Sequence, residues 1–96
     1  MEKINTEVIE KLRCLIADSD PQAIYDFIDH YQPIDFAEIV EELDDVEISS
    51  LVRLLDDNRL ASLMEESDDD ERIRIARTLD NRRLMTAFEY MQKDDI

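Results

Sequence analysis

The sequence has no glycine, no tryptophan and only two prolines, Pro21 and Pro33, in 96 residues. Sheet proteins normally use glycine in their tight hairpin turns, because these turns require positive φ angles. The absence of glycine, together with abundant leucine, isoleucine, glutamate, aspartate and arginine, therefore predicts helices that are joined by short turns.

Cysteine and long apolar segments are also scarce. Cys14 is the only cysteine, so no internal disulfide can form and a reducing compartment fits the chain. No apolar run approaches the roughly 20 residues that a membrane span needs, and the first residues lack the apolar stretch of a signal peptide. We therefore expect a soluble, cytoplasmic chain that does not itself insert into a membrane. Because Cys14 lies among Leu12, Leu15 and Ile16, we also expect a buried, unreactive thiol.

Basic residues are few relative to acidic ones. Eleven lysines and arginines face 26 aspartates and glutamates, which gives a formal net charge of −15. Such a chain is repelled by phosphate backbones, so the composition argues against nucleic-acid binding. Hydrophobic residues make up 44% of the chain, which is too many for a disordered acidic tail. The partners that this charge favours are cations and basic protein surfaces.

The main positive feature is a repeat of twelve residues that begins near residue 31. Within each unit, apolar residues fall at i, i+3, i+4 and i+7, which is one face of a helix. Only Arg72 and Ser67 interrupt the four apolar columns. The columns are Phe36, Ile48, Leu60, Arg72 and Leu84; Ile39, Leu51, Leu63, Ile75 and Ala87; Val40, Val52, Met64, Ala76 and Phe88; and Leu43, Leu55, Ser67, Leu79 and Met91.

Helices of about ten residues are unstable alone in water, so they must stack on one another. We therefore expect an all-α fold, a right-handed superhelix (solenoid) of short helices that repeat about every twelve residues. Residues 1–32 fit the repeat less well and are predicted to form N-terminal capping helices, and residues 33–96 the helical repeat of the same domain. The predicted helices lie near residues 5–17, 20–31, 33–43, 45–55, 57–67, 69–79 and 81–92.

Acidic turns separate the predicted helices. Aspartate and asparagine are preferred N-caps, because their side-chain oxygens accept hydrogen bonds from free backbone N–H groups. We expect Asp57, Asp69 and Asn81 each to cap the helix that follows, and Asp20 to cap the helix that starts at Pro21.

No arrangement of residues indicates catalysis. His30 and Cys14 lie on different predicted helices, and no nucleophile–base set, phosphate loop or zinc spacing is present. The acidic run at residues 67–71 lacks the glycine of an EF-hand and is better explained as a capped, solvated turn than as a metal site. The density of acidic residues is compatible with magnesium, because Mg²⁺ keeps several waters and takes one or two carboxylates. Core packing is the preferred role of the aromatic residues Tyr25, Phe27, Tyr31, Phe36, Phe88 and Tyr90.

Several segments resemble the intracellular N-terminal domain of the MgtE magnesium transporters. Residues 33–43, PIDFAEIVEEL, are similar to the opening of that domain. Residues 51–55 are similar to its leucine-rich second helix, and residues 57–61 and 80–84 to its recurrent turn. Residues 89–96, EYMQKDDI, resemble a late segment of the family that ends in an Asp-Asp pair and an apolar residue. The resemblance covers residues 33–96.

The resemblance implies a regulatory domain that senses magnesium. In the family, Mg²⁺ bound between this domain and a pair of CBS domains holds the cytosolic part compact and the transmembrane pore closed. It implies low-affinity Mg²⁺ binding here, with Asp94 as the first candidate ligand and Asp95 and Glu89 as weaker ones. The implied partners are Mg²⁺ and the CBS and transmembrane domains of the same transporter.

An alternative reading remains. The flagellar motor-switch protein FliG has a similar helical repeat, so the chain is also compatible with a stand-alone acidic module that binds a basic protein surface. A DNA mimic belongs to this second class. The family's next helix and its CBS and pore parts are not in this sequence, so we expect either one part of a longer transporter or a separate relative.

Overall fold

The computed structural model describes residues 5–92, with side chains as far as Met91, and within that range it contains seven helices. No strand occurs among these residues, so the predicted all-helical fold is confirmed. The helices are α1 (Thr6–Asp18), α2 (Pro21–Asp29), α3 (Pro33–Val40), α4 (Asp45–Leu54), α5 (Asp57–Glu66), α6 (Asp69–Ala76) and α7 (Asn81–Gln92).

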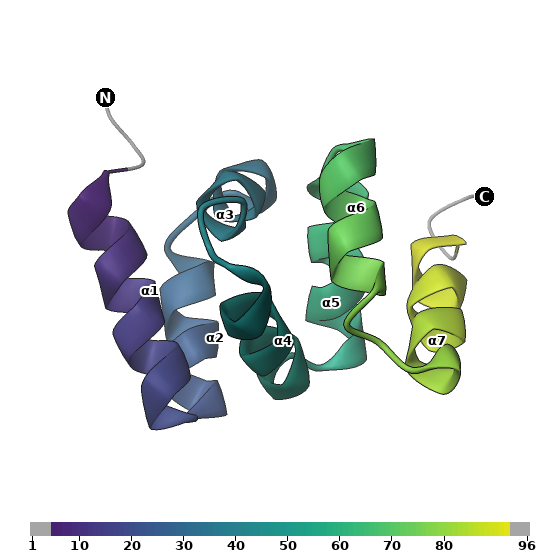
Figure 1. Ribbon diagram of the computed structural model, residues 1–96, viewed down its shortest axis with the longest axis horizontal. Helices are drawn as coiled ribbons and strands as arrows, with labels where there is room; N and C mark the ends of the chain where they lie inside the picture. The colour runs from purple at the N-terminus through teal and green to yellow at the C-terminus, as the bar shows by residue number, and fades with distance from the viewer. Residues whose placement is uncertain (1–4, 93–96) are drawn as a thin grey trace.

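The helices follow one another along the longest axis of the molecule, and α1 and α7 lie at opposite ends (Figure 1). In the repeat, each helix packs on the next but one: α5 contacts both α3 and α7, and α4 contacts α6. At the first end, α1 packs on α2 and α4. This stacking is consistent with the predicted superhelix. Its right-handed sense and the capping role of residues 1–32 stay predictions.

The apolar columns of the sequence form the core. The column Ile39, Leu51, Leu63, Ile75 and Ala87 runs through α3 to α7 with no side chain more than 2% exposed. Because these residues recur on the same face of every helix, each helix adds one layer to a continuous core. Two residues of α1, Leu12 and Ile16, extend this core beyond the repeat.

The two polar residues in the apolar columns have a common structural role at the turn between α5 and α6. Ser67 is buried, and its hydroxyl donates to the Leu63 carbonyl at 2.7 Å. The Arg72 guanidinium donates to the carbonyls of Met64 at 2.9 Å and Ser67 at 3.2 Å. The last carbonyls of a helix have no partner within the helix. Both polar side chains therefore satisfy backbone groups at the end of α5.

The predicted N-caps of three helices are wrong by one residue. Asp56, Asp68 and Asp80, not the residues that follow them, accept the capping hydrogen bonds, each at 2.8 or 2.9 Å. The first acid has the extended backbone that an N-cap requires, and the second is already helical. Asp20 caps α2 as predicted, with hydrogen bonds from the backbone N–H groups of Gln22 and Ala23.

Two further expectations need correction. Cys14 is exposed rather than buried, because Leu12 and Ile16 point inward and Cys14, two residues from each, lies on the opposite face of α1. The helical segments α3 and α6 end three residues earlier than predicted. After each helix the chain continues in a tighter turn, with hydrogen bonds between residues three apart. The Leu43 N–H donates to the Val40 carbonyl, and the Leu79 N–H donates to the Ala76 carbonyl.

The aromatic residues divide into two groups. Phe27 and Phe36 are buried, with their ring centroids 6.4 Å apart in an edge-to-face arrangement. The prediction that these aromatic residues pack in the core is therefore confirmed for Phe27 and Phe36. Core packing is wrong for Phe88 and Tyr90, which are 43% and 36% exposed on α7.

Candidate cation-binding surface

The predicted metal ligands lie at the C-terminal end of the chain. Glu89 is on the exposed surface of α7. Asp94 and Asp95 fall outside the described residues, so the structure does not test their role. Among residues 5–92, no three histidine, cysteine, aspartate or glutamate side chains lie close enough together to hold a metal ion.

The acidic turns of the repeat use their two carboxylates differently. The first acid accepts backbone hydrogen bonds at a helix N-terminus, where the helix dipole also favours negative charge. At the turn before α4 this is a capping box, in which Asp44 and Glu47 each accept a bond from the other's backbone N–H. The second acid pairs with an arginine further along the chain: Asp45 lies 2.7 Å from Arg74.

Arginines also bind carbonyls at the ends of the helices. Around the turn between α3 and α4, Arg13 of α1 donates to Glu42 O at 3.3 Å and Arg74 of α6 donates to Leu43 O. Around the next turn, Arg83 of α7 donates to Val52 O at 2.9 Å and to Leu55 O. These arginines do what a C-terminal glycine motif commonly does in other helices. They join helices that are far apart in the sequence.

The electrostatic consequence is that three arginines are held in ion pairs at fixed places in the fold. Arg83 holds Asp57 at 3.1 Å, Arg13 holds Glu47 at 2.8 Å, and Arg74 holds Glu71 at 2.8 Å. These arginine side chains are 26% to 34% exposed. The sequence analysis did not predict this network of arginine ion pairs. Its one visible signal was Arg72, a charged residue in an otherwise apolar column.

One group of acidic residues lies close enough to Glu41 to change its pKa. The pKa of Glu41 is raised by partial desolvation of its carboxyl group and by the negative charges of Asp68, Glu71, Glu38 and Glu42. The charges come from the end of α3 and the start of α6, which the stack brings together. A positive ion near this surface would lower the repulsion among these carboxylates.

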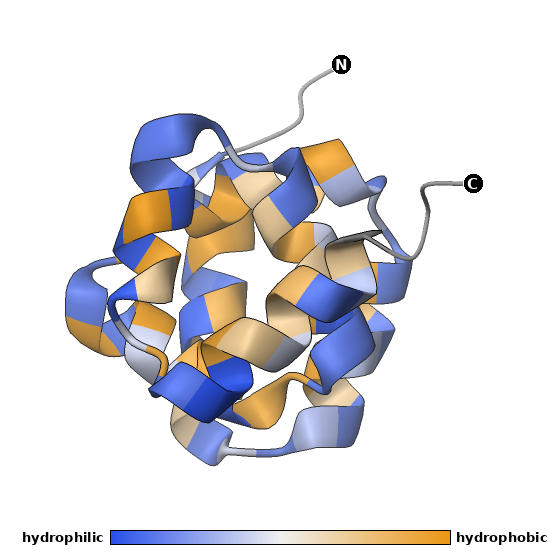
Figure 2. Cartoon of the chain, turned by 90° about the vertical axis from the view of Figure 1, so that its right-hand side faces the viewer, coloured by the Kyte–Doolittle hydropathy of each residue, from blue (hydrophilic) through white to orange (hydrophobic). Residues whose placement is uncertain are grey.

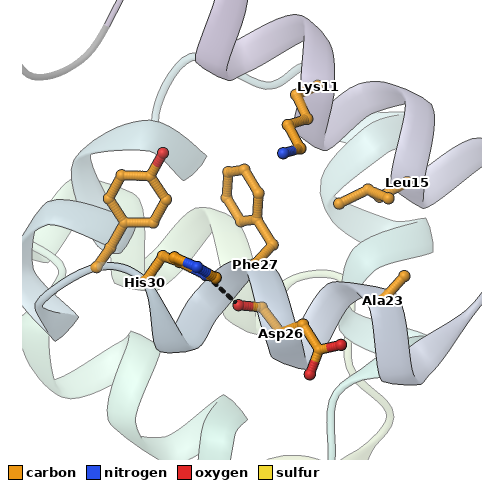
Figure 3. Close-up of a pocket in the computed structure, with 7 residues that line it drawn as sticks. Lys11, Leu15, Ala23, Asp26, Phe27 and His30 are labelled. Atoms are coloured by element: carbon orange, nitrogen blue, oxygen red, sulfur yellow. Dashed lines mark hydrogen bonds between the residues drawn. The ribbon is translucent and has the colours of Figure 1, made fainter.

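A separate hollow lies between α1 and α2 (Figure 3). Its wall carries Phe27 and Leu15, and the polar side chains Lys11, Asp26 and His30 stand around it. The His30 Nδ1 atom lies 2.8 Å from the backbone oxygen of Asp26. With only one carboxylate and one imidazole, the hollow does not offer the carboxylate set that Mg²⁺ prefers.

Together the fold and the charges define a class of protein: a short, acidic, all-helical repeat domain. Residues 31–96 match the family described as the MgtE intracellular N domain. The chain therefore belongs to this family, which is an intracellular part of magnesium transporters. The match begins close to α3, and α1 and α2 lie before it. No curated protein and no solved structure matches the chain. None of the helices described here is long and apolar enough to cross a membrane.

Proposed function

We propose that this chain is the cytosolic regulatory domain of a magnesium transporter or channel, and that it senses Mg²⁺ through its acidic surface to gate transport. The family match over residues 31–96 is the observation that carries this proposal. The proposal assigns the chain no catalytic reaction. Its partners would be Mg²⁺ and the CBS and transmembrane domains of the same transporter.

The charge distribution supports a response to divalent cations. The chain has fifteen more acids than bases, and five of its arginines form the ion pairs described within residues 5–92. Clustered carboxylates repel one another and oppose the approach of a second acidic surface. A divalent cation between two such surfaces would favour the compact arrangement, so the Mg²⁺ concentration would set the population of that state.

The proposed ligands are Asp94, Asp95 and Glu89. Magnesium keeps several of its waters and binds one or two carboxylates from any single element. A site that two domains share therefore needs only a small contribution from this chain. Binding by the chain alone would be weak, because the carboxylates of the second domain are missing from the isolated site.

Thermal unfolding of the chain tests the proposal. We expect MgCl₂ to raise the midpoint by a few degrees over NaCl at equal ionic strength, since a ligand that binds only the folded state stabilises it. The variant Glu89→Gln/Asp94→Asn/Asp95→Asn should lose this difference. The control Glu7→Gln/Asp18→Asn/Asp29→Asn removes the same charge from α1 and α2 and should keep this difference. Equal midpoints in the two salts, or equal losses in both variants, would contradict a specific site.

A further inference from the structure

The hollow between α1 and α2 has the size and the lining of a site for a small organic ligand. Its volume is about 480 Å³, and ligand pockets in proteins usually measure about 300–1,000 Å³. Leu15 of α1 and Ala23 and Phe27 of α2 supply its apolar wall. The ring of Tyr31 lies beside that of Phe27, with the two ring centroids 5.1 Å apart. An aromatic ligand would therefore find apolar and aromatic surface to pack against.

Two of the polar side chains around this hollow already have partners. The Asp26 carboxylate accepts a hydrogen bond from the Gln22 side-chain amide, one turn earlier on α2, at 3.1 Å. The His30 Nδ1 atom lies 2.8 Å from the backbone oxygen of Asp26. When Nδ1 carries the proton of the neutral ring, Nε2 is left as an acceptor for a ligand N–H or O–H group.

Lys11 differs from these two, because it has no ion pair or hydrogen bond within the part of the chain that the structure describes. The acids close to it on α1 are Glu7 and Glu10, and Glu10 pairs with Arg13 instead, at 2.5 Å. Figure 3 shows the Lys11 side chain reaching over the hollow toward the Phe27 ring. The hollow thus combines an apolar wall with one cation that has no anionic partner.

We propose that this hollow binds a small aromatic carboxylate. The ring of the ligand packs against Phe27 and Leu15, its carboxylate pairs with the Lys11 ammonium group, and an N–H group of the ring donates to His30 Nε2. An organic cation fits the hollow less well, because Lys11 repels it. The net charge of −15 lowers the affinity of the chain for any anion, so we expect weak binding. The site uses none of the proposed magnesium ligands.

Three ligands of similar size test the proposal by amide chemical shifts of the ¹⁵N-labelled chain at constant ionic strength. Indole-3-acetate carries the carboxylate, indole-3-acetamide is its neutral counterpart, and tryptamine is a cation. We expect indole-3-acetate to give saturable shifts in α1 and α2 with a Kd of about 1 mM. Indole-3-acetamide should bind about two- to fivefold more weakly, because it lacks the ion pair with Lys11.

Variants assign the binding to the hollow. Lys11→Gln should weaken indole-3-acetate about two- to fivefold and leave the affinity for indole-3-acetamide unchanged. The control Arg53→Gln removes one positive charge from the exposed surface of α4 and should change the affinity by less than about 1.5-fold. Ala23→Gln places a longer side chain in the hollow and should abolish the saturable shifts. Circular dichroism checks that all three variants remain folded.

Several results would overturn the proposal. Indole-3-acetamide or tryptamine could bind in the hollow as tightly as indole-3-acetate, which would show that the carboxylate is not recognised. Equal weakening in Lys11→Gln and Arg53→Gln would reduce the effect to the net charge of the chain. The absence of saturable shifts up to about 10 mM indole-3-acetate, or saturable shifts centred on the exposed apolar residues of α7, would show that the hollow is not the site.

Discussion

The two ends of the helical stack differ in how they meet solvent. At the first end, α1 directs Leu12 and Ile16 into the core and exposes mostly polar residues. At the other end, α7 buries Ala87 on the inner side and still exposes Met85 and Phe88 on the outer side. The terminal units of repeat proteins require a polar outer face for solubility. The first end meets that requirement, and the second meets it only in part, because Met85 and Phe88 are exposed.

The strongest test of this comparison is to remove an inward side chain from the first end. Leu12 is fully buried, so Leu12→Ala should lower the free energy of unfolding by about 2–5 kcal/mol. Met85→Ala, at the other end, should change it by less than about 0.5 kcal/mol. Urea unfolding followed by circular dichroism measures both. If the two variants lose similar stability, α1 does not close the core and the comparison fails.

A second prediction concerns Arg83, which joins α7 to the turn between α4 and α5. Arg83→Ala removes the bonds to Val52 O and Leu55 O and the ion pair with Asp57. Because the Leu55 carbonyl and the Asp57 carboxylate both lose their arginine partner, we expect a loss of about 1–3 kcal/mol. Arg53→Ala, at an exposed arginine of α4, should cost less than about 0.5 kcal/mol.

Urea midpoints of these two variants, measured side by side, check the prediction. Equal small losses would mean that water replaces the guanidinium of Arg83 at no cost. The arginine network would then contribute little to the stability of the turns.

A third prediction separates the two residues at the start of α7. Asp80 accepts the capping bond from Arg83 N–H at 2.8 Å, and Asn81 is already in the helix. We expect Asp80→Ala to cost about 1 kcal/mol and Asn81→Ala a few tenths at most. Thermal unfolding of the pair measures the difference. The reverse order would restore Asn81 as the cap that the sequence predicted.

The smallest expected effect comes from the acids around Glu41. The pKa of Glu41 in the folded chain is raised by partial desolvation and then by its acidic neighbours, so its contribution to stability is favourable below the unfolded pKa and is lost as pH rises through the folded pKa. Glu41→Gln should therefore stabilise the chain at pH 7, by about a few tenths of a kcal/mol because the site is exposed to solvent.

The pH dependence of thermal unfolding checks this sign. The gain from Glu41→Gln should disappear near pH 3 and shrink at high salt, where the neighbouring charges are neutralised or screened. The control Glu7→Gln removes one charge from α1, outside the group that acts on Glu41. An equal gain in the control would reduce the effect to the net charge of the chain.

The sequence predicted the helices well because local signals determine them. The twelve-residue spacing located every helix of the repeat, and the buried column from Ile39 to Ala87 follows from it. The caps were displaced by one residue, because either acid of a pair can cap and only the backbone angles decide between them.

Two features of the structure could not be predicted from local sequence patterns. The Arg83 and Asp57 side chains meet because the rows of helices stack, and nothing in either segment indicates the other. Phe88 lies in an apolar column and was expected in the core. A column predicts burial only where another helix covers it, so the pattern could not reveal that Phe88 is exposed.

The most direct test of the central claim, that this acidic stack senses Mg²⁺ at its C-terminal end, is a titration of the ¹⁵N-labelled chain followed by amide chemical shifts at constant ionic strength. We predict saturable shifts at Glu89 and the residues that follow it, with smaller changes at the acidic turns before α4, α5 and α6. Equal, unsaturable shifts at every acidic turn would contradict the claim, because they would show only that cations screen the chain as a whole.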